Sequence, residues 1–430
     1  MNISPARTSA FDILLKIAGE RAYSSVLLPA YEEGLSRADA ALCHEITLGV
    51  LRRQIYLDRV IDTIAKGKKL DIAVRIALRI GLYQIIALDR VPTHSAVNES
   101  VNLTVRAKKT SAKGFVNAVL RTFSRERPQI EFVDRVDRIS VNTSHPRWLI
   151  EKWVRDLGID EAERFAEANN ILPETAFRIL QMDAEVEGLV RDSRASSRTL
   201  GCWIAAAGDA RVRTLATRGS IYLQDEASQI VANSVELGQG SRFLDVCAAP
   251  GGKTGLVARN YSGAARLIVA GDIHEKRVGF LQRTCEIQQP GTVSVVRYDA
   301  VTALPFAERV LASVLVDAPC SGTGTIRHNP EIRYHLTEDH FLELQAKQLS
   351  ILENASKLLV DGGELIYSTC SVEPEENEVV AERFLSRNPH FAQISLRVPS
   401  DLIEAKGYAR TWPHRNGMDG FFIAGFRRLN

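Results

Sequence analysis

The sequence predicts a multidomain chain: an all-helical domain, then a small α+β domain, then an α/β domain with a doubly wound parallel sheet. Three observations predict this division. Apolar residues recur with a helical period up to about Arg127, the pattern becomes mixed from about residue 141, and strand-like and helix-like runs alternate after Gln224. A length of 430 residues fits about three domains. We place them at residues 1–140, 141–223 and 224–430.

The composition is that of an ordinary globular protein, with 45% hydrophobic and 25% charged residues. It excludes a disordered chain, a collagen-like fibre and a small disulfide scaffold. Arg75 and Arg79 interrupt the most apolar stretch, Ala73–Leu88, so we expect no membrane span, and the first residues show no signal peptide. The six cysteines form no CxxC pair. We therefore expect a cytoplasmic monomer with reduced thiols and no metal ion.

The first domain is predicted to contain five to seven helices. Its first amphipathic stretch places Phe11, Leu14, Leu15 and Ala18 at helical spacing. A break at Pro92–Ser95 then starts a further helix.

Positive charge is concentrated in this first domain. Residues 1–140 hold 22 Lys and Arg against 15 Asp and Glu, a net charge of +7, whereas the whole chain carries only +2. Arg106, Lys108, Lys109 and Lys113 cluster at the end of one predicted helix and in the next loop. A localised basic face is typical of a protein that binds nucleic acid, whereas scattered charge is typical of a solvated surface. The composition alone leaves both interpretations open.

The second domain is predicted from short elements of both kinds. One helix is expected to begin near Pro146, a second covers Ala162–Asn170, and a third lies around Val186–Ser193. Short strands are expected at Phe177–Leu180 and Ile221–Leu223.

The third domain is predicted from a regular alternation of strands and helices, which is typical of a doubly wound sheet. The parallel strands are expected at Arg242–Val246, Leu267–Ala270, Val293–Arg297, Ser313–Val316 and Glu364–Ser368, followed by an antiparallel strand at Phe421–Phe426. The helices are expected near Thr254–Asn260, Lys276–Glu286 and Phe341–Leu359. In such sheets a ligand lies beyond the carboxyl ends of the strands. The candidate functional residues all follow those ends.

The first strand leads into the run DVCAAPGGKT, residues 245–254. A Gly-rich turn here lets a ligand approach backbone amides at a helix N-terminus. The run is not a P-loop, because that pattern requires Gly where this chain has Cys247, and no GxGxxG fingerprint is present. A tight strand-to-helix turn without a ligand is the alternative interpretation.

Two aspartates mark the ends of the next two strands: the second strand ends at Gly271-Asp272, and the third is followed by Tyr298-Asp299. The first is placed to accept hydrogen bonds from a ribose diol, and the second to hold the exocyclic amine of a purine. Either one alone is more typical of a helix cap. Together with the Gly-rich turn they favour a ligand that contains adenosine.

A cysteine follows each of the last two parallel strands: Cys320 in DAPCSGTG, which begins at Asp317, and Cys370 in YSTCS. Carbon C5 of cytosine is a poor nucleophile, but a thiolate that adds at C6 makes C5 able to accept a methyl cation. A second group must later remove the C5 proton. Two cysteines and an aspartate suit this chemistry as nucleophile, base and pyrimidine holder. Two cysteines that are merely buried are the alternative.

These motifs, together with VEPEENE and the terminal DGFFIAGFRR, resemble the signature set of the Nol/Nop/Sun family of RNA (cytosine-5) methyltransferases over about residues 224–430. In the first domain LCHEITLGVLRR, PTHSAVNESVNLT and AKGFVNAVLR resemble the NusB-like RNA-binding domain fused to one branch of that family, which acts on bacterial 16S rRNA. The resemblance implies a NusB-like domain and a Rossmann-like class I methyltransferase domain. It also implies S-adenosylmethionine (SAM) as cofactor and 16S rRNA as partner.

Site residues follow from the same resemblance. Those implied to surround SAM are Cys247, Ala248, Ala249, Pro250, Gly251, Gly252, Lys253, Asp272, Asp299 and Asp317. The implied catalytic residues are Cys370 as the nucleophile at C6, Cys320 for proton removal and product release, Asp317 at the cytosine edge and Lys253 beside the reacting centre. The first domain is expected to supply RNA affinity through its basic cluster.

Other segments match the family less completely. Arg178-Ile179-Leu180 stands where family members often have Arg-Val-Asn, so an RNA contact of this strand is in doubt although Arg178 is kept. Asp225, in the run QDEAS, matches the entry to the methyltransferase domain, and Arg327 and Asn329 match a loop that is expected to contact RNA.

Three other functions are weighed against this one. An amino-methyltransferase would carry an Asn/Asp-Pro-Pro-aromatic run after the fourth strand, where this chain has Asp-Ala-Pro-Cys at residues 317–320. A NusB-like RNA-binding factor with an inactive enzyme domain would not need intact motifs. A tRNA cytosine-5 methyltransferase differs only in substrate, which the residues alone do not decide.

Overall fold

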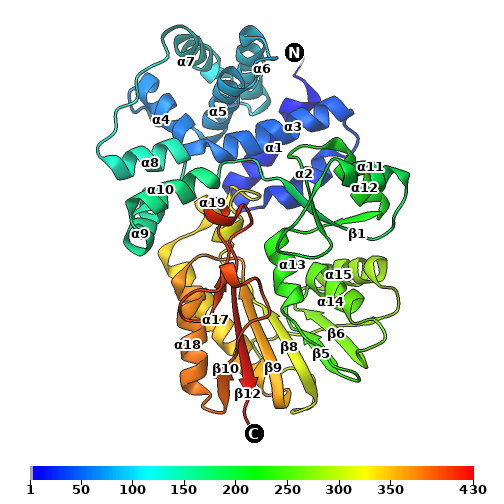
Figure 1. Cartoon of the computed structure of the whole chain (residues 1–430). Coiled ribbons are helices and arrows are strands. Elements are labelled where there is room, and N and C mark those ends of the chain that lie inside the picture. The colour runs from blue at the N-terminus through cyan, green and yellow to red at the C-terminus, as the bar shows by residue number, and fades with distance from the viewer. Residues whose placement is uncertain (1–2) are drawn as a thin grey trace. The chain divides into compact units, whose positions relative to one another are not determined.

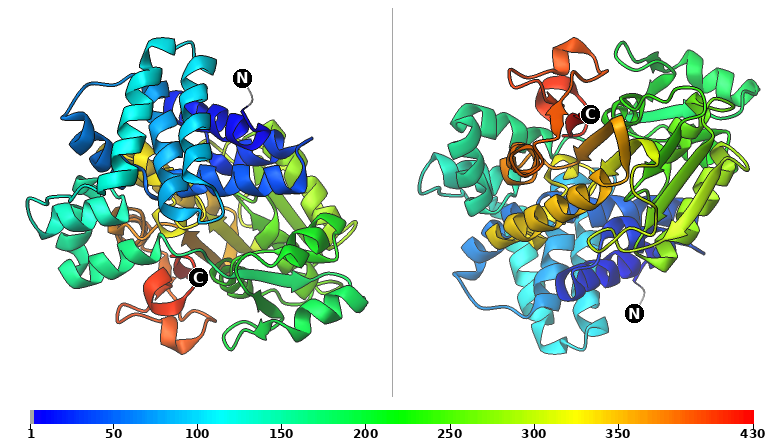
Figure 2. Two further views of the ribbon diagram at one scale, coloured as in Figure 1. Left: turned by 90° about the horizontal axis from the view of Figure 1, so that it is seen from above. Right: turned by 90° about the horizontal axis from the view of Figure 1, so that it is seen from below.

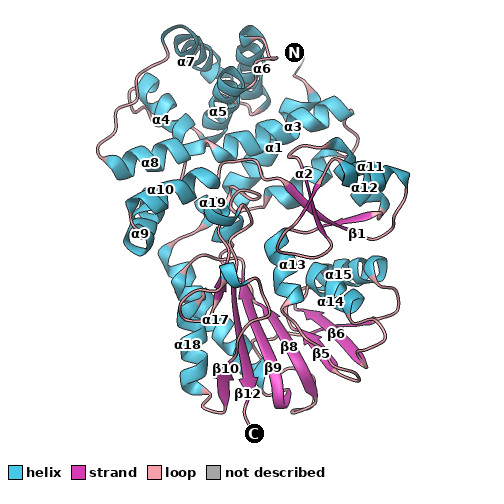
Figure 3. Ribbon diagram, in the orientation of Figure 1, coloured by secondary structure: helices cyan, strands magenta, loops and turns pink. Residues whose placement is uncertain are grey.

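The computed structural model describes residues 3–430 (Figure 1), so the first two residues of the predicted first domain lie outside the described residues. The chain forms two compact units. The helical unit comprises the chain up to Ile171 together with Ile326–His335, and the sheet unit comprises Leu172–Thr325 together with Leu336–Asn430. Figure 3 shows that strands occur only in the sheet unit. The division into three domains stays a prediction.

Between residues 3 and 171 the helical unit contains ten α-helices. They are α1 (Pro5–Glu20), α2 (Ser24–Glu32), α3 (Arg37–Arg52), α4 (Gln54–Ala65), α5 (Ile72–Ala87), α6 (Thr93–Arg106), α7 (Lys113–Glu126), α8 (Arg135–Thr143), α9 (Arg147–Leu157) and α10 (Ile159–Ala168). The described chain before Arg127 thus holds seven of them, within the predicted five to seven. In Figure 2 these blue to green helices appear in two further views. Side chains cap several of them, for example Asp71, which accepts from the backbone N–H of Ala73 at the start of α5.

Helix α5 forms the centre of the core of this unit. Its apolar face packs with residues of α1, α3 and α7. Arg79, buried on this helix, is paired with Asp58 at 2.6 Å, and Arg75 is paired with Asp62 at 2.9 Å. The two arginines that interrupt the apolar stretch are therefore satisfied within the unit. None of the helices within residues 3–430 has the length and hydropathy needed to cross a membrane.

The segment Ile326–His335, which ends in the short helix α16 (Ile332–His335), belongs to the helical unit. The carboxylate of Glu331 accepts hydrogen bonds from the backbone N–H (2.7 Å) and hydroxyl (2.9 Å) of Ser24. Arg333, fully buried, donates to the carbonyl of Thr143 at 2.9 Å. Arg327, which the resemblance places in an RNA-contacting loop, is only 6% exposed.

The sheet unit begins with a small antiparallel sheet of strand order β2-β3-β1-β4. Its elements are β1 (Thr175–Ile179), α11 (Ala184–Arg191), β2 (Arg194–Ala195), β3 (Cys202–Ala205), α12 (Ala210–Arg218) and β4 (Ile221–Leu223). Phe177, Leu189 and Leu215 form its core with Ile221. The strands and the helix predicted for this stretch are confirmed to within a few residues.

The large sheet has the strand order β10-β12-β9-β8-β5-β6-β7. Its strands are β5 (Arg242–Asp245), β6 (Leu267–Asp272), β7 (Val293–Arg297), β8 (Leu311–Asp317), β9 (Leu359–Thr369), β10 (Phe391–Gln393) and β12 (Phe422–Arg428), and β11 (Ala409–Arg410) pairs with β12. Strands β5 to β9 are parallel, whereas β12 is antiparallel to β9, as predicted. The chain order reverses on either side of β5, which creates the switch point where ligands bind in such sheets.

Helices cover both faces of this sheet. They are α13 (Glu226–Asn233), α14 (Gly252–Asn260), α15 (Glu275–Gln288), α17 (Glu338–Ser356) and α18 (Glu378–Arg387), and the short helix α19 (Pro413–Asn416) lies in the loop before β12. Successive residues of β5 point to opposite faces: Phe243 packs in one cluster with α13 and α14, and Leu244 in another with α17 and α18. Burial on both faces explains why the inner strands β5, β6 and β8 are largely apolar, whereas the edge strand β7 has no fully buried residue.

One boundary prediction is wrong. The helix predicted at Phe341–Leu359 ends at Ser356, and Leu359 already begins β9. Between the pairs Leu311–Leu359 and Ser313–Glu364 the register shifts, and Gly362 lies in the left-handed region with φ +77°. Leu359 and Val360 lie before this irregularity and are separated from the apolar run that follows it. In the sequence they therefore resemble the end of the preceding helix.

Candidate active site

The turn between β5 and α14 is built to expose backbone amides. Gly251, with φ +105°, forms the N-cap of α14 and offers no side chain to the first helical turn. Asp245, fully buried, accepts a hydrogen bond from the hydroxyl of Thr254 at 2.6 Å and so ties the two ends of the turn together. Burial raises the pKa of Asp245 to about 7. The free N–H groups at the start of α14 suit an anionic group of a ligand.

A pocket of about 210 Å³ lies beside this turn. Its lining includes the predicted residues Cys247, Ala248, Ala249, Pro250, Gly252, Lys253 and Asp317, together with Asp245 and with Tyr222, Leu223, Gln224, Asp225 and Ser228. The predicted residues Gly251, Asp272, Asp299, Cys320 and Cys370 do not line it. The structure therefore brings seven of the twelve predicted site residues into one pocket, and adds a wall from β4 and the start of α13.

The two predicted adenosine-binding carboxylates each contact the turn that follows their own strand. Asp272, 4% exposed at the end of β6, accepts from the backbone N–H of His274 at 3.0 Å and lies 3.4 Å from a guanidinium nitrogen of Arg277. Asp299 accepts from the backbone N–H of Val301 at 2.9 Å. Asp272 ends β6 and Asp299 follows β7 after one residue, so both lie at the carboxyl ends of neighbouring strands, where the sequence places them.

The two cysteines after β8 and β9 meet. The Sγ atom of Cys320 lies 3.2 Å from the Sγ atom of Cys370. The backbone N–H of Gly324 donates to the carbonyl of Cys370 at 2.9 Å, which joins the two loops behind the thiols. The hydrogen bond to Cys370 and burial raise the pKa of Cys320 well above the ordinary value for a cysteine.

An ion pair lies at the same edge of the sheet. Lys253 Nζ lies 2.7 Å from a carboxylate oxygen of Asp317, whose other oxygen accepts from the hydroxyl of Ser368 at 2.8 Å. The ammonium of Lys253 also lies 5.1 Å from the ring centre of Phe421. Although burial favours the neutral amine, the carboxylate of Asp317 raises the pKa of Lys253 above its ordinary value. The lysine is therefore a fixed cation.

One residue of this site was not singled out from the sequence. Glu376 is fully buried and accepts hydrogen bonds from the hydroxyls of Ser321 (2.5 Å) and Ser371 (2.6 Å), the residues that follow the two cysteines. It also accepts from the side-chain amide of Gln348 at 3.0 Å. Burial raises the pKa of Glu376. The sequence shows two Cys-Ser pairs and the acidic run VEPEENE, which contains Glu376. Only the fold shows that Glu376 contacts the serines of both pairs.

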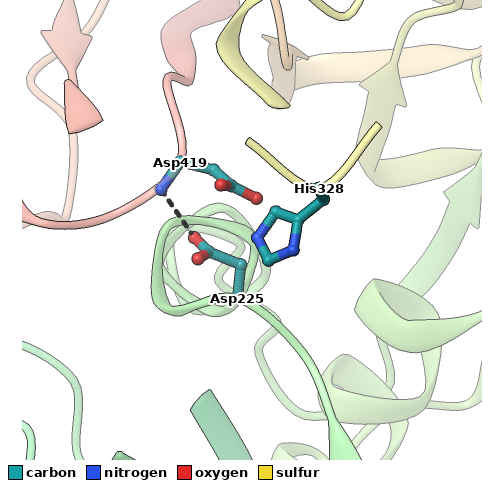
Figure 4. A group of neighbouring side chains, drawn as sticks. All are labelled: Asp225, His328 and Asp419. Atoms are coloured by element: carbon teal, nitrogen blue, oxygen red, sulfur yellow. Dashed lines mark hydrogen bonds between the residues drawn. The ribbon is translucent and has the colours of Figure 1, made fainter. Parts of the chain in front are cut away.

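The loop before α13 is hydrogen-bonded to the loop before β12. Asp225, the N-cap of α13, accepts from the backbone N–H of Ala227 at 2.9 Å and from that of Asp419 at 3.2 Å (Figure 4). This pairing connects two motifs, QDEAS and DGFF, that lie almost two hundred residues apart in the sequence.

The predicted basic cluster of the helical unit is partly neutralised. Arg106 pairs with Asp12 at 2.6 Å, and Lys109 pairs with Asp71 at 2.7 Å. Lys108 is exposed, whereas Lys113 is half-buried. Two of the four cations therefore already have an acidic partner in the same unit.

Comparisons with known proteins agree with this architecture. Residues 4–125 match the model of the NusB family, and residues 232–427 match the model of the 16S rRNA methyltransferase RsmB/F family. The probable ribosomal RNA small subunit methyltransferase B of Bacillus subtilis is 31% identical, covering 100% of both chains. The ribosomal RNA small subunit methyltransferase B of Pseudomonas putida is 32% identical, covering 95% of this chain and 97% of that protein.

Solved structures share the fold. The crystal structure of the protein PH0851 is 27% identical and covers 100% of both chains, with a TM-score of 0.83. That of NSun6 from Pyrococcus horikoshii is 19% identical, with a TM-score of 0.58, and covers 66% of this chain and 98% of that one. Identity, coverage and the two matched family models lead to one conclusion. This chain, which carries a NusB domain, belongs to the ribosomal RNA small subunit methyltransferase B family of SAM-dependent enzymes.

Proposed function

We propose that this protein transfers a methyl group from SAM to carbon C5 of a cytosine in 16S rRNA, through a covalent bond between Cys370 and C6. The observation that carries this proposal is the 3.2 Å approach of the thiols of Cys320 and Cys370 beside the ion pair of Lys253 and Asp317. A site for direct methyl transfer to a nitrogen needs no thiol nucleophile, whereas methylation of C5 requires one group that adds at C6 and another that removes the C5 proton.

The cofactor fits the turn after β5. The free N–H groups at the start of α14 suit the carboxylate of its methionine part, and Asp272 suits its ribose hydroxyls. When bound, SAM supplies the methyl group as an electrophile. Lys253 and Asp317, held together at 2.7 Å, line the pocket beside this turn and orient the cytosine edge.

The two cysteines divide the chemistry between them. The raised pKa of Cys320 keeps its proton in place, which leaves Cys370 as the proposed nucleophile, and a cysteine attacks as its thiolate. Attack by this thiolate forms the bond from sulfur to C6. That bond consumes the negative charge at Cys370, which is one of the causes of the raised pKa of Cys320. Cys320 then releases its proton to water more readily and accepts the C5 proton of the methylated ring. The bond from sulfur to C6 breaks, and the aromatic ring is restored.

The test compares substrates and methylated atoms. Purified protein is incubated with labelled SAM and either 16S rRNA or tRNA, and the modified nucleosides are identified by mass spectrometry. We expect 5-methylcytidine in 16S rRNA, and bisulfite mapping of rRNA from cells that lack the protein identifies the position. A methyl group on a nitrogen, or on tRNA alone, contradicts the proposal. Absence of SAM binding indicates an RNA-binding factor with an inactive enzyme domain.

A further inference from the structure

Arg178 lies against the turn between β5 and α14, where the cofactor is proposed to bind. The sequence alone does not establish a role in RNA binding for this residue. It is 4% exposed, on β1 of the small sheet. Its Nε atom donates to the side-chain carbonyl of Gln224 at 2.9 Å. Its Nη2 atom donates to the backbone carbonyl of Gly252 at 3.2 Å and to the side-chain carbonyl of Gln288 at 2.5 Å. The guanidinium therefore connects the small sheet with the start of α14.

Gln288 completes a second connection to the same turn. This residue, 6% exposed at the end of α15, donates from its side-chain amide to the backbone carbonyl of Gly251 at 3.3 Å. Two consecutive carbonyls of the turn thus accept from two side chains that also bond to each other. Because a peptide group is planar, with its C=O and N–H pointing in opposite directions, fixing these carbonyls also fixes the N–H groups of Gly252 and Lys253.

The electrostatics of Arg178 are those of a functional group rather than of a packing element. The acceptors that the structure gives it are all neutral: two side-chain amides and one backbone carbonyl. Burial lowers the pKa of Arg178 to about 10, and its Nη1 atom, which is buried, has no hydrogen-bond partner within residues 3–430. A buried charge without an opposite charge is costly, so such a group is rarely retained for stability alone. Its positive charge lies beside a helix N-terminus that favours an anion.

The glycine at position 255 supports the same arrangement. A Cβ atom added to Gly255 would lie 2.4 Å from the side-chain amide of Gln288. The close approach of Gln288 to the turn therefore depends on the absence of a side chain at this position.

We propose that Arg178 and Gln288 are positioning residues for the cofactor turn. They hold the amides of Gly252 and Lys253 toward the carboxylate of the bound SAM, and Arg178 adds a positive charge behind them. Arg178 then serves cofactor binding from behind the turn, rather than binding RNA. This inference rests on the proposed function only in taking SAM as the ligand of the turn.

The test measures SAM binding to the full-length protein without RNA, by calorimetry. We expect Arg178→Met to raise the Kd for SAM about tenfold, the scale of one lost hydrogen bond with a charged group. Arg178→Lys keeps the positive charge but not the several N–H donors of the guanidinium. Its Kd for SAM is expected to lie between those of the wild type and Arg178→Met. Gly255→Ala displaces Gln288 while leaving Arg178 intact, and is expected to raise the same Kd. The KM for SAM should rise in each variant, while the Kd for RNA stays unchanged.

A matched control separates this role from general destabilisation. Arg428→Met removes another largely buried guanidinium of the sheet unit, one that lies 3.4 Å from Asp361 near the start of β9. Thermal unfolding is followed for all variants, and Arg428→Met is expected to lose stability with the Kd for SAM unchanged. If Arg178→Met does not fold, Arg178→Lys and Gly255→Ala decide the question.

An unchanged Kd for SAM in the folded Arg178 and Gly255 variants overturns the inference, and a loss confined to RNA binding returns Arg178 to an RNA role. The proposed function fails separately, if the methyl group is found on another atom while the variants still weaken SAM binding.

Discussion

Glu376 joins the residues that follow the two cysteines, because its carboxylate accepts from Ser321 at 2.5 Å and from Ser371 at 2.6 Å. The loops after β8 and β9 are therefore held by one buried side chain, and the separation of the two thiols depends on it. This relationship gives the first prediction.

Glu376→Ala is expected to lower kcat strongly while leaving the Kd for SAM unchanged, because it releases the thiols without touching the cofactor turn. It should also reduce stability by about 1–3 kcal/mol, since buried donors, among them the backbone N–H of Ser321, lose their acceptor. Glu376→Gln keeps one acceptor oxygen, so its kcat and its stability should lie between those of the wild type and Glu376→Ala. Single-turnover kinetics and thermal unfolding measure both effects. Wild-type kcat in a folded Glu376→Ala protein contradicts the assigned role.

The second prediction separates the two cysteines. Cys370→Ala is expected to form no covalent bond with RNA and to have no turnover. Cys320→Ala is expected to attack and methylate but to release the product slowly, so that methylated RNA stays linked to Cys370 in a denaturant-resistant complex. The double variant should lose that complex. Gel electrophoresis with labelled RNA checks this, and an adduct that survives in Cys370→Ala while vanishing in Cys320→Ala reverses the roles.

The third prediction concerns the ribose. Asp272→Ala is expected to weaken SAM binding by about 1.5–3 kcal/mol, the range for hydrogen bonds to a charged group. Affinity for RNA should change little. Asp361→Ala, at the other end of the parallel strands, is the control for general effects of losing a carboxylate. Calorimetry that finds equal affinity in Asp272→Ala and wild type removes Asp272 from the cofactor site.

The fourth prediction follows from the buried carboxyl of Asp245. Its pKa, about 7 in the folded protein, lies above the ordinary value of about 3.9 in an unfolded chain. The folded state therefore holds this proton more tightly, so its contribution to stability is fully present below about pH 4 and is lost as pH rises toward 7. Asp245→Asn removes this dependence. From pH 4 to pH 8 the unfolding free energy of the wild type should fall relative to that of the variant. If the difference between the two proteins does not vary with pH, the raised pKa of Asp245 is refuted.

The fifth prediction concerns RNA affinity. Each phosphate contact contributes about 0.7–0.9 to the slope of log Kd against log salt. Because Arg106 and Lys109 already pair with Asp12 and Asp71, we expect replacement of Lys108 and Lys113 by Ala to reduce this slope more than replacement of the two paired residues. SAM binding should stay intact in both double variants. Filter binding over a range of salt concentrations compares them, and equal slopes in all proteins exclude this cluster as the RNA contact.

The inner parallel strands could be predicted because they are buried on both faces, so that runs such as Val314–Val316 are continuously apolar. The strand ends then indicated where Asp272, Cys320 and Cys370 lie. The role of Glu376 could not be predicted in this way, because its partners come from different loops. The same holds for Arg178, whose residue type suggests an exposed RNA contact and whose burial beneath the cofactor turn depends on the packing of two sheets. Sequence patterns report local periodicity, and these contacts are not local.

The segment Ile326–His335 has a consequence for synthesis on the ribosome. Ser24 and its acceptor Glu331 are 307 residues apart in the sequence. The carbonyl of Thr143 and its donor Arg333 are 190 residues apart. Domains generally fold in order as the chain emerges. Here the first-made unit lacks this ten-residue segment until translation passes His335, when most of the sheet unit has also been made. During that interval, groups at Ser24 and Thr143 face water. A nascent chain that stalls before this point carries an incomplete helical unit, and a truncation at Ile171 reproduces that unfinished state permanently.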